Sequence, residues 1–268
     1  MVSKPVSVLI VFVAVIILAS VFIFYSDNEI VICPIPSTLI ENDLSYQNFS
    51  GCNLAGVTMD RLNLEGTNFS HANLTGAYIV SSDLRDTNFS FSVLQGVVFS
   101  NSYLKNVTMT EIELSGSDLG GVTLTESYIS GGDLRGVILS GADLSGSDLS
   151  SADLRGGDLR GTNLSNTNIS DGNLMGSIMS GADLSNSNMI SVDLRNADLA
   201  GSNLTSADLS GADLRGVNIK GANLTNANLT NADLTGVDLS GANLSNANLT
   251  DVNLTGVILY CFNNSICK

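Results

Sequence analysis

A fixed five-residue period runs from Leu44 to Leu259 and limits the folds that this chain can adopt. Every fifth residue in this stretch is Leu, Ile, Met or Phe, and no insertion shifts the phase. Five residues match neither the 3.6-residue period of an amphipathic helix nor the two-residue alternation of a strand. An uninterrupted short period of this kind indicates a solenoid.

Each pentad position has its own chemistry. We call the large apolar residue the centre; the residue two before it is small or β-branched, as Ala142 is before Leu144, so we expect both to point inward. The residue before the centre is mostly Asp or Asn, and the residue after it is mostly Ser, Thr or Arg. The next residue, which we call the corner, is Gly, Asn or Ser in most pentads, and most of the 26 glycines stand there. These residues tolerate positive φ, so we expect the chain to turn at each corner.

A second period of ten residues predicts a four-sided coil. The centres at 44, 54, 64 and onward in tens are all Leu, and every other centre type falls in the alternate set. A coil of twenty residues, with opposite sides alike, produces this alternation. One side would then stack three aromatic rings, one per coil: Phe49, Phe69 and Phe89.

The pattern resembles the pentapeptide-repeat family, whose consensus is A(D/N)LXX. Residues 142–146 (Ala-Asp-Leu-Ser-Gly) and 222–226 (Ala-Asn-Leu-Thr-Asn) match it position by position. The resemblance implies an all-β fold, a right-handed quadrilateral parallel β-helix with four pentads per coil. It further implies about 11 coils in a rod about 50 Å long, at about 4.8 Å between coils.

The ends of such a rod need caps, because an open end exposes apolar core and unpaired backbone. We expect residues 26–38 to form a linker and amino-terminal cap, and 39–259 to form the solenoid. We expect residues 260–268 to cap the last coil. The apolar residues that would cover the ends are Ile30, Val31, Ile32, Ile35 and Leu39 at one end, and Tyr260, Phe262 and Ile266 at the other.

The segment 6–25 contains no charged residue and is apolar almost throughout. As a helix it would be about 30 Å long, enough to cross a bilayer. Lys4 lies in the preceding residues 1–5, and Asp27 and Glu29 follow the segment. The positive-inside rule then places 1–5 in the cytoplasm and the repeats outside a membrane crossed by one transmembrane helix. The alternative is a cleaved signal peptide, but a cut before residue 21 would put Leu18 at the −3 position, which favours an uncleaved anchor.

Four cysteines bracket the repeats: Cys33, Cys52, Cys261 and Cys267. Four cysteines allow three pairings. In the rod that the resemblance implies, the ends lie about 50 Å apart, whereas a disulfide needs Cα atoms within about 7 Å. Only Cys33 with Cys52, and Cys261 with Cys267, are then compatible. Cys52 occupies an inward position, so a buried free thiol there is the alternative.

A set of charged residues recurs at multiples of twenty, which we call the arginine–aspartate ladder. We expect it to form one outward column, interrupted at Met175, either as a self-neutralised surface that contributes little or as a docking strip for a protein. Its members are Asp133, Arg135, Asp153, Arg155, Asp193, Arg195, Asp213 and Arg215.

The net charge of −15 raises a different function. An acidic column on a neighbouring side, Asp118, Asp158, Asp198 and Asp238, could imitate DNA. Some cytoplasmic proteins of the family that the chain resembles, the quinolone-resistance proteins, protect DNA gyrase in that way. Direct nucleic-acid binding is not expected, because the chain has no basic stripe.

The chain contains 14 Asn-X-Ser/Thr sequons, and most of them follow from the repeat consensus itself. Asn106 and Asn263 lie at other positions and are the candidate glycosylation sites. The source organism decides whether exported proteins are glycosylated.

Catalysis has almost no support in the sequence. The single histidine, His71, falls at an outward corner, and the chain shows no nucleophile–base set. We expect no cofactor and no metal, because the carboxylate columns lack the irregular loop of a Ca²⁺ site. The favoured function is therefore a non-enzymatic, membrane-anchored extracytoplasmic scaffold or interaction surface for an unknown protein partner. The alternative is the acidic DNA mimic, and end-to-end assembly into a homo-oligomer is a further possibility.

Overall fold

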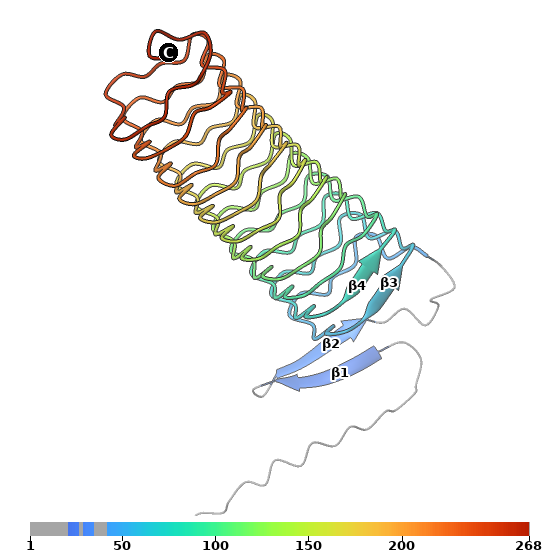
Figure 1. The fold of residues 1–268 in the computed structure, drawn as a ribbon. Coiled ribbons are helices and arrows are strands. Elements are labelled where there is room, and N and C mark those ends of the chain that lie inside the picture. The colour runs from blue at the N-terminus through green and yellow to red at the C-terminus, as the bar shows by residue number, and fades with distance from the viewer. Residues whose placement is uncertain (1–20, 27–28, 35–41, 268) are drawn as a thin grey trace, which may run out of the picture.

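The computed structural model describes residues 21–26, 29–34 and 42–267. The repeats wind into a straight four-sided rod with the carboxyl terminus at its far end (Figure 1). Residues 1–20, which include most of the expected membrane helix, lie outside the described residues. The predictions for Ile35 and Leu39 in the cap, and for the side chains of Ile30, Val31 and Ile32, fall outside them as well.

The coil contains twenty residues, as the ten-residue alternation predicts. Parallel backbone bridges join residues twenty apart, from the Asp43–Asn63 pair to the Asp238–Ile258 pair. The bridges lengthen into strands at β3 (Thr58–Asp60) and β4 (Tyr78–Val80), which pair in parallel with Met59 opposite Ile79. The last bridge joins Asn243 to Phe262, nineteen residues on, so the register shortens by one residue where the repeats end.

One pentad shows how the consensus satisfies the backbone. In residues 142–146, Ala142 N donates within its own turn to Leu139 O, Asp143 N donates to the preceding coil, and the amides of Leu144 and Gly146 donate to the next coil. The remaining amide, Ser145 N, donates to the carboxylate Oδ1 of Asp143 at 3.0 Å. All five N–H groups therefore have acceptors, as buried or packed backbone requires.

The corners adopt the left-handed conformation that the sequence predicts. Every corner from 46 to 256 has positive φ, including all 22 glycines with positive φ. The remaining corners carry residues such as Asn, Asp and Ser, with bulkier exceptions at Tyr46 (φ 59°) and Phe91 (φ 60°). The turn is thus repeated identically whatever the corner side chain is.

The interior of the rod is a continuous stack of centres. Almost all centres from Leu44 to Leu244 are buried, as are most of the small residues two before them. Phe69 stacks on Phe49 and on Phe89 with ring centroids 5.2 Å apart in both pairs, so the predicted aromatic stack is confirmed. Where the small inward residue is Ser or Thr, its hydroxyl donates to a carbonyl of the preceding coil, as Thr67 does to Leu44 O, or of its own turn, as Thr167 does to Leu164 O.

The amino-terminal side of the rod differs from the prediction. Residues 21–25, expected to end the membrane helix, lie in strand β1 (Val21–Ser26), which pairs antiparallel with β2 (Glu29–Pro34) (Figure 1). β-Branched and aromatic residues such as Val21, Phe22 and Ile23 favour a strand, and the pairing of the two strands runs from Val21 with Pro34 to Ser26 with Glu29. The described segments contain no helix that could cross a membrane.

The carboxyl-terminal cap is also built differently from the prediction. Tyr260 and Phe262 are exposed rather than packed on the last coil. Phe262 continues the backbone ladder opposite Asn243, in the position before a centre, and side chains at that position point outward. Ile266 packs against the core, and Asn264 Nδ2 donates to Leu244 O at 3.1 Å.

Candidate interaction surface: the arginine–aspartate ladder

The ladder lies on one side of the rod, the side whose centres are Leu134, Leu154 and their equivalents every twenty residues. Each aspartate stands before a centre and each arginine after it, so both side chains point away from the core. Backbone bridges place Asp133 beside Asp153, and Asp193 beside Asp213, in adjacent coils. The coil at Asn173 and Met175 separates the two halves, as the sequence predicts.

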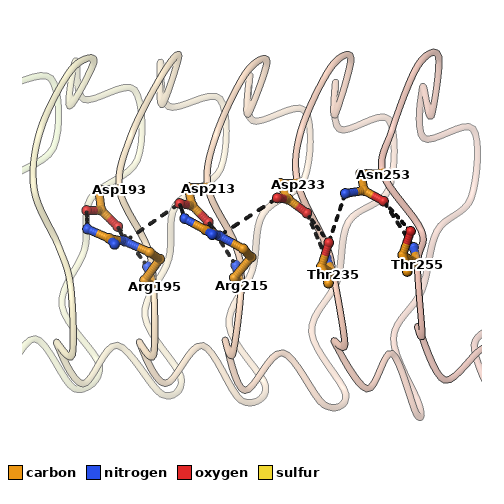
Figure 2. Close-up of polar contacts among 8 residues, drawn as sticks. All are labelled: Asp193, Arg195, Asp213, Arg215, Asp233, Thr235, Asn253 and Thr255. Carbon is orange, nitrogen blue, oxygen red and sulfur yellow. Dashed lines mark hydrogen bonds and ion pairs between the residues drawn. The ribbon is translucent and has the colours of Figure 1, made fainter.

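Within each coil the arginine donates hydrogen bonds to its aspartate from two nitrogens. Arg195 Nε donates to Asp193 Oδ1 at 2.9 Å, and Arg195 Nη2 donates to Asp193 Oδ2 at 2.6 Å (Figure 2). Arg135, Arg155 and Arg215 repeat this arrangement. Such bidentate contacts fix the plane of the guanidinium as well as its position.

The pairs are also linked from coil to coil. Arg195 Nε lies 3.6 Å from Asp213 Oδ2, and Arg215 Nε lies 3.8 Å from Asp233 Oδ2. Asp233 extends the ladder by one coil beyond the predicted set. Thr235 Oγ1 donates to the Asp233 carboxylate, and Asn253 Nδ2 donates to Thr235 Oγ1, so uncharged side chains continue the contacts (Figure 2). The ladder arginines keep 42–54% of their side-chain surface exposed, so they remain accessible to a partner.

The pKa of each ladder aspartate is lowered. The hydrogen bonds from Arg195 are the largest cause at Asp193, and partial burial opposes them. The same causes act at Asp133, Asp153 and Asp213. The ladder therefore carries fixed, alternating charges over the ordinary pH range.

The acidic column on the neighbouring side is interrupted. Asp118, Asp158 and Asp198 share the column, but the bridges place Ile138 between the first two and Ile178 between the last two. Asp158 pairs with Arg160 at 2.6 Å. Asp238 pairs with Lys220 at 2.8 Å, and this contact is the main reason that its pKa is lowered to about 2. The carboxylates of this side thus form no unbroken acidic stripe.

The four cysteines form two disulfides, Cys33–Cys52 with Cα atoms 5.7 Å apart and Cys261–Cys267 with Cα atoms 5.0 Å apart. This is the pairing expected from the rod. Cys52 is buried at its inward position and ties β2 to the first coil.

The sequons occupy two kinds of site. Asparagines before a centre are engaged, as at Asn163, whose Oδ1 accepts from Ser165 N and whose Nδ2 donates to Asp143. Asn106 is an exposed corner whose Nδ2 donates to Asp86, and Asn263 has positive φ beyond the repeats. Glycosylation of Asn106 and Asn263 stays a prediction.

The single histidine lies at the surface of the rod. His71 is an exposed corner, as predicted, and stacks on Phe91 with centroids 5.1 Å apart. Among residues 21–26, 29–34 and 42–267, no group of His, Cys, Asp or Glu side chains is arranged to hold a metal ion.

Comparison with known sequences assigns the fold. The sequence model of the pentapeptide repeats matches repeatedly, at residues 48–86, 82–121, 110–141, 117–156, 142–181, 182–221 and 222–259. The chain belongs to the pentapeptide-repeat family. Proteins of this family form right-handed quadrilateral β-helices, and the four-sided coils described above agree with that fold.

Several solved pentapeptide-repeat structures are similar to this chain. HetL of the cyanobacterium Nostoc, involved in regulation of heterocyst differentiation, is 29% identical with a TM-score of 0.35, over 80% of this chain and 92% of HetL. QnrB1, a plasmid-mediated fluoroquinolone resistance protein, is 25% identical with a TM-score of 0.47, over 70% of this chain and 91% of its own. A protein of the Arabidopsis thaliana thylakoid lumen is 33% identical with a TM-score of 0.23, over 43% of this chain and 66% of its own. None of the curated proteins matches this chain.

Two further Asp-Leu-Arg pairs in this pentapeptide-repeat chain were not singled out from the sequence. Arg85 contacts Asp83 at 2.6 Å and Glu65 of the preceding coil at 2.9 Å, and Arg160 contacts Asp158. The signal was present, because Asp-Leu-Arg at 83–85 and 158–160 repeats the spacing of the ladder. These pairs lie on other sides of the rod and do not extend the ladder.

Proposed function

We propose that this pentapeptide-repeat protein is a non-enzymatic interaction scaffold, tethered on the outer side of a membrane, that presents its arginine–aspartate ladder to a protein partner. The observation that carries the proposal is the geometry of the ladder. Each guanidinium is held in a fixed plane by its own aspartate, at the spacing of the coils. A rigid, regular array of this kind suits recognition, because little side-chain freedom is left to lose on binding.

The free edge of each guanidinium suggests the partner's chemistry. Nε and Nη2 of Arg195 and Arg215 are engaged by aspartates, whereas Nη1 makes no hydrogen bond within the described part of the chain. An arginine has five N–H donors, so donors remain for an acceptor outside the protein. Carboxylates and backbone carbonyls of a partner are the groups that these donors would bind.

Two features support a location outside the cytoplasm. Disulfides persist in oxidising compartments, and the chain has one at each end of the solenoid. In this proposal the tether lies within the apolar residues 6–20. Because β1 includes residues 21–25, the apolar residues left before it are 6–20, a length that also fits the apolar region of a signal peptide.

The location is tested by treating intact cells or spheroplasts with protease and probing the solenoid. We expect the carboxyl-terminal repeats to be cleaved or released from the outside. We also expect extraction of the full-length chain to need detergent, with an intact amino terminus by mass. Repeats that stay shielded would overturn the location, and a mature chain that lacks residues 6–20 would overturn the tether.

The ladder is tested by comparing the proteins cross-linked to wild type with those cross-linked to Arg195→Gln and to Arg160→Gln. Arg160 makes the same two-nitrogen contact with its own aspartate, but outside the ladder, so it is a matched control. The proposal expects a partner that is lost with Arg195→Gln and kept with Arg160→Gln. Equal recovery with both variants would count against the ladder as the docking surface.

The alternative, an acidic mimic of DNA that binds an enzyme such as gyrase, draws on the net charge of −15. The neighbouring Ile138 and Ile178 and the pairing of Asp158 with Arg160 give it less support than the scaffold. Recovery of gyrase by residues 27–268 at low salt, with loss at high salt, would favour the mimic.

A further inference from the structure

A groove of about 410 Å³ runs along one corner of the rod, away from the ladder. Two adjacent columns of side chains line it over four coils. One column runs along a corner and contains Asn106, Glu126, Gly146 and Asn166; the other runs along the next side and contains Tyr128, Asp148 and Asn168. The bridges Tyr128–Asp148 and Asp148–Asn168 confirm that the members of the second column are neighbours in successive coils.

The groove exists because one corner lacks a side chain. Gly146 (φ +71°) stands where the coils before and after carry Glu126 and Asn166. A Cβ on Gly146 would contact only Glu126 Cγ, at 3.8 Å, so a side chain could be accommodated there. The Tyr128 side chain, which is 55% exposed, lines this gap together with Asp148.

The charges around the groove favour a cation. Glu126 and Asp148 contribute two carboxylates, and the side of the rod that carries Tyr128 and Asp148 has no Lys or Arg in any of its pentads. An aromatic ring attracts a cation over its face, and a carboxylate hydrogen-bonds strongly to guanidinium or ammonium donors. One positively charged side chain lies nearby: Lys105 Nζ contacts Glu126 Oε1 at 3.2 Å, at the edge of the groove.

We propose that the groove at Gly146 binds a basic side chain, preferably arginine, of a protein partner. A planar guanidinium can stack on the Tyr128 ring while it donates to the carboxylates, which a compact ammonium does less well. The inference rests on the proposed function as an interaction scaffold, and it adds a second contact of opposite character to the ladder. Lys105 competes for Glu126, so it weakens the site.

The test titrates the full-length chain in detergent with acetyl-Gly-Arg-Gly-amide and follows amide and tyrosine NMR signals. The neutral citrulline peptide is the control for charge, and spermidine is the control for a free polyamine. We expect the arginine peptide to bind at least about tenfold more tightly than the citrulline peptide, and more tightly than spermidine. Equal binding of the citrulline peptide would overturn a cation site, and tighter binding of spermidine would overturn a side chain as its occupant.

Matched variants locate the site. Gly146→Asn fills the gap with a residue that the same corner column already carries at Asn166, and it should lower affinity about tenfold. Gly136→Asn, at a glycine corner outside the groove, should change nothing. Tyr128→Ala should lower affinity about two- to fivefold, the value of an exposed cation–π contact, whereas Tyr103→Ala, equally exposed at the equivalent position of another side, should not.

One further variant should raise the affinity for the arginine peptide instead of lowering it. Lys105→Gln releases Glu126 and should raise affinity for the arginine peptide about twofold or more, as the loss of one exposed ion pair allows. Unchanged affinity in both Gly146→Asn and Lys105→Gln would overturn the proposal. These measurements need no natural partner, so their result is independent of whether the ladder docks one.

Discussion

At the scale of single residues, each position of the pentad has one physical task. The centre fills the core, the small residue two positions before it allows close packing, and the corner takes positive φ. The acceptor role of the Asp or Asn before the centre is visible only in the structure. Its side-chain oxygen binds the amide two residues on, as Asp143 does for Ser145, and thus supplies the one acceptor that the coils do not.

The adjacent glycines Gly120 and Gly121 allow the effect of positive φ at a corner to be measured separately from the effect of adding a methyl group. Gly121 has φ +66° with open space around it, whereas Gly120 follows a centre and lies outside the positive-φ set. Gly121→Ala should destabilise the fold by about 1 kcal/mol, because alanine is strained in the left-handed region.

Gly120→Ala should be close to neutral, because the restriction of the unfolded chain is offset by the approach of the added Cβ to Asp118 Oδ1, at 3.2 Å. Urea unfolding of the two variants makes the comparison. A larger loss of stability for Gly120→Ala than for Gly121→Ala would contradict the assignment of the corner.

The ladder predicts a pH effect at Asp193. Its pKa is lowered below that of a free aspartate mainly by hydrogen bonds from Arg195. The stabilisation is therefore complete above about pH 4, the unfolded value, and is lost as pH falls through the lower folded pKa. Arg195→Met, which copies the natural Met175, should raise the pKa of Asp193 toward about 3.9.

Carbon-13 NMR titration of the carboxyl groups measures this shift. Asp158, paired with Arg160 on another side, should keep its lowered pKa in the variant. An Asp193 pKa that does not rise in Arg195→Met would show that the ladder geometry is wrong.

At the scale of the coil, burial is complete in the middle of the rod and falls at its end. Leu154 is buried at 1% exposure, whereas Leu254, the equivalent centre in the last coil, is only half-buried. Leu154→Ala should cost about 2–5 kcal/mol, because it leaves a cavity between two coils. Leu254→Ala should cost less, since one of its faces has no coil above it, and thermal or urea unfolding would rank the two.

The same scale shows what the sequence could predict. The centres, the corners, the twenty-residue coil and the Phe49–Phe89 stack follow from periodicity, because identical environments recur in every coil. The ends have no such repetition. The sequence of residues 21–25 predicts part of an apolar helix, whereas the structure pairs them with β2. Phe262 is predicted to cap the core, but its backbone bridge to Asn243 leaves its side chain exposed.

The candidate surfaces divide in a similar way. The ladder could be predicted because Asp-Leu-Arg recurs at twenty-residue intervals. The groove could not, because it depends on the absence of one corner side chain at Gly146 beside an exposed Tyr128. A gap of this kind is defined by its neighbours in adjacent coils, which the linear order does not place together.

At the scale of the whole molecule, the protein is a one-dimensional stack. Each coil contacts only the coils beside it, so stability should be close to a sum of coil and interface contributions. The disulfides Cys33–Cys52 and Cys261–Cys267 lie at the two ends, where one neighbour is missing. A rod of this kind provides fixed spacing along its sides, which is the property that the proposed scaffold uses.

The most direct test of this account removes one coil. Deletion of residues 142–161 joins the corner at Gly141 to Thr162, so both the pentad phase and the four sides are kept, whereas deletion of 142–159 breaks the phase. We predict that the first variant gives the β-rich circular dichroism spectrum and cooperative unfolding of the parent, with small-angle scattering from a rod about 5 Å shorter. The second variant should lose structure beyond the junction. Equal folding of both variants, or unfolding of the first, would contradict a solenoid built from identical twenty-residue coils.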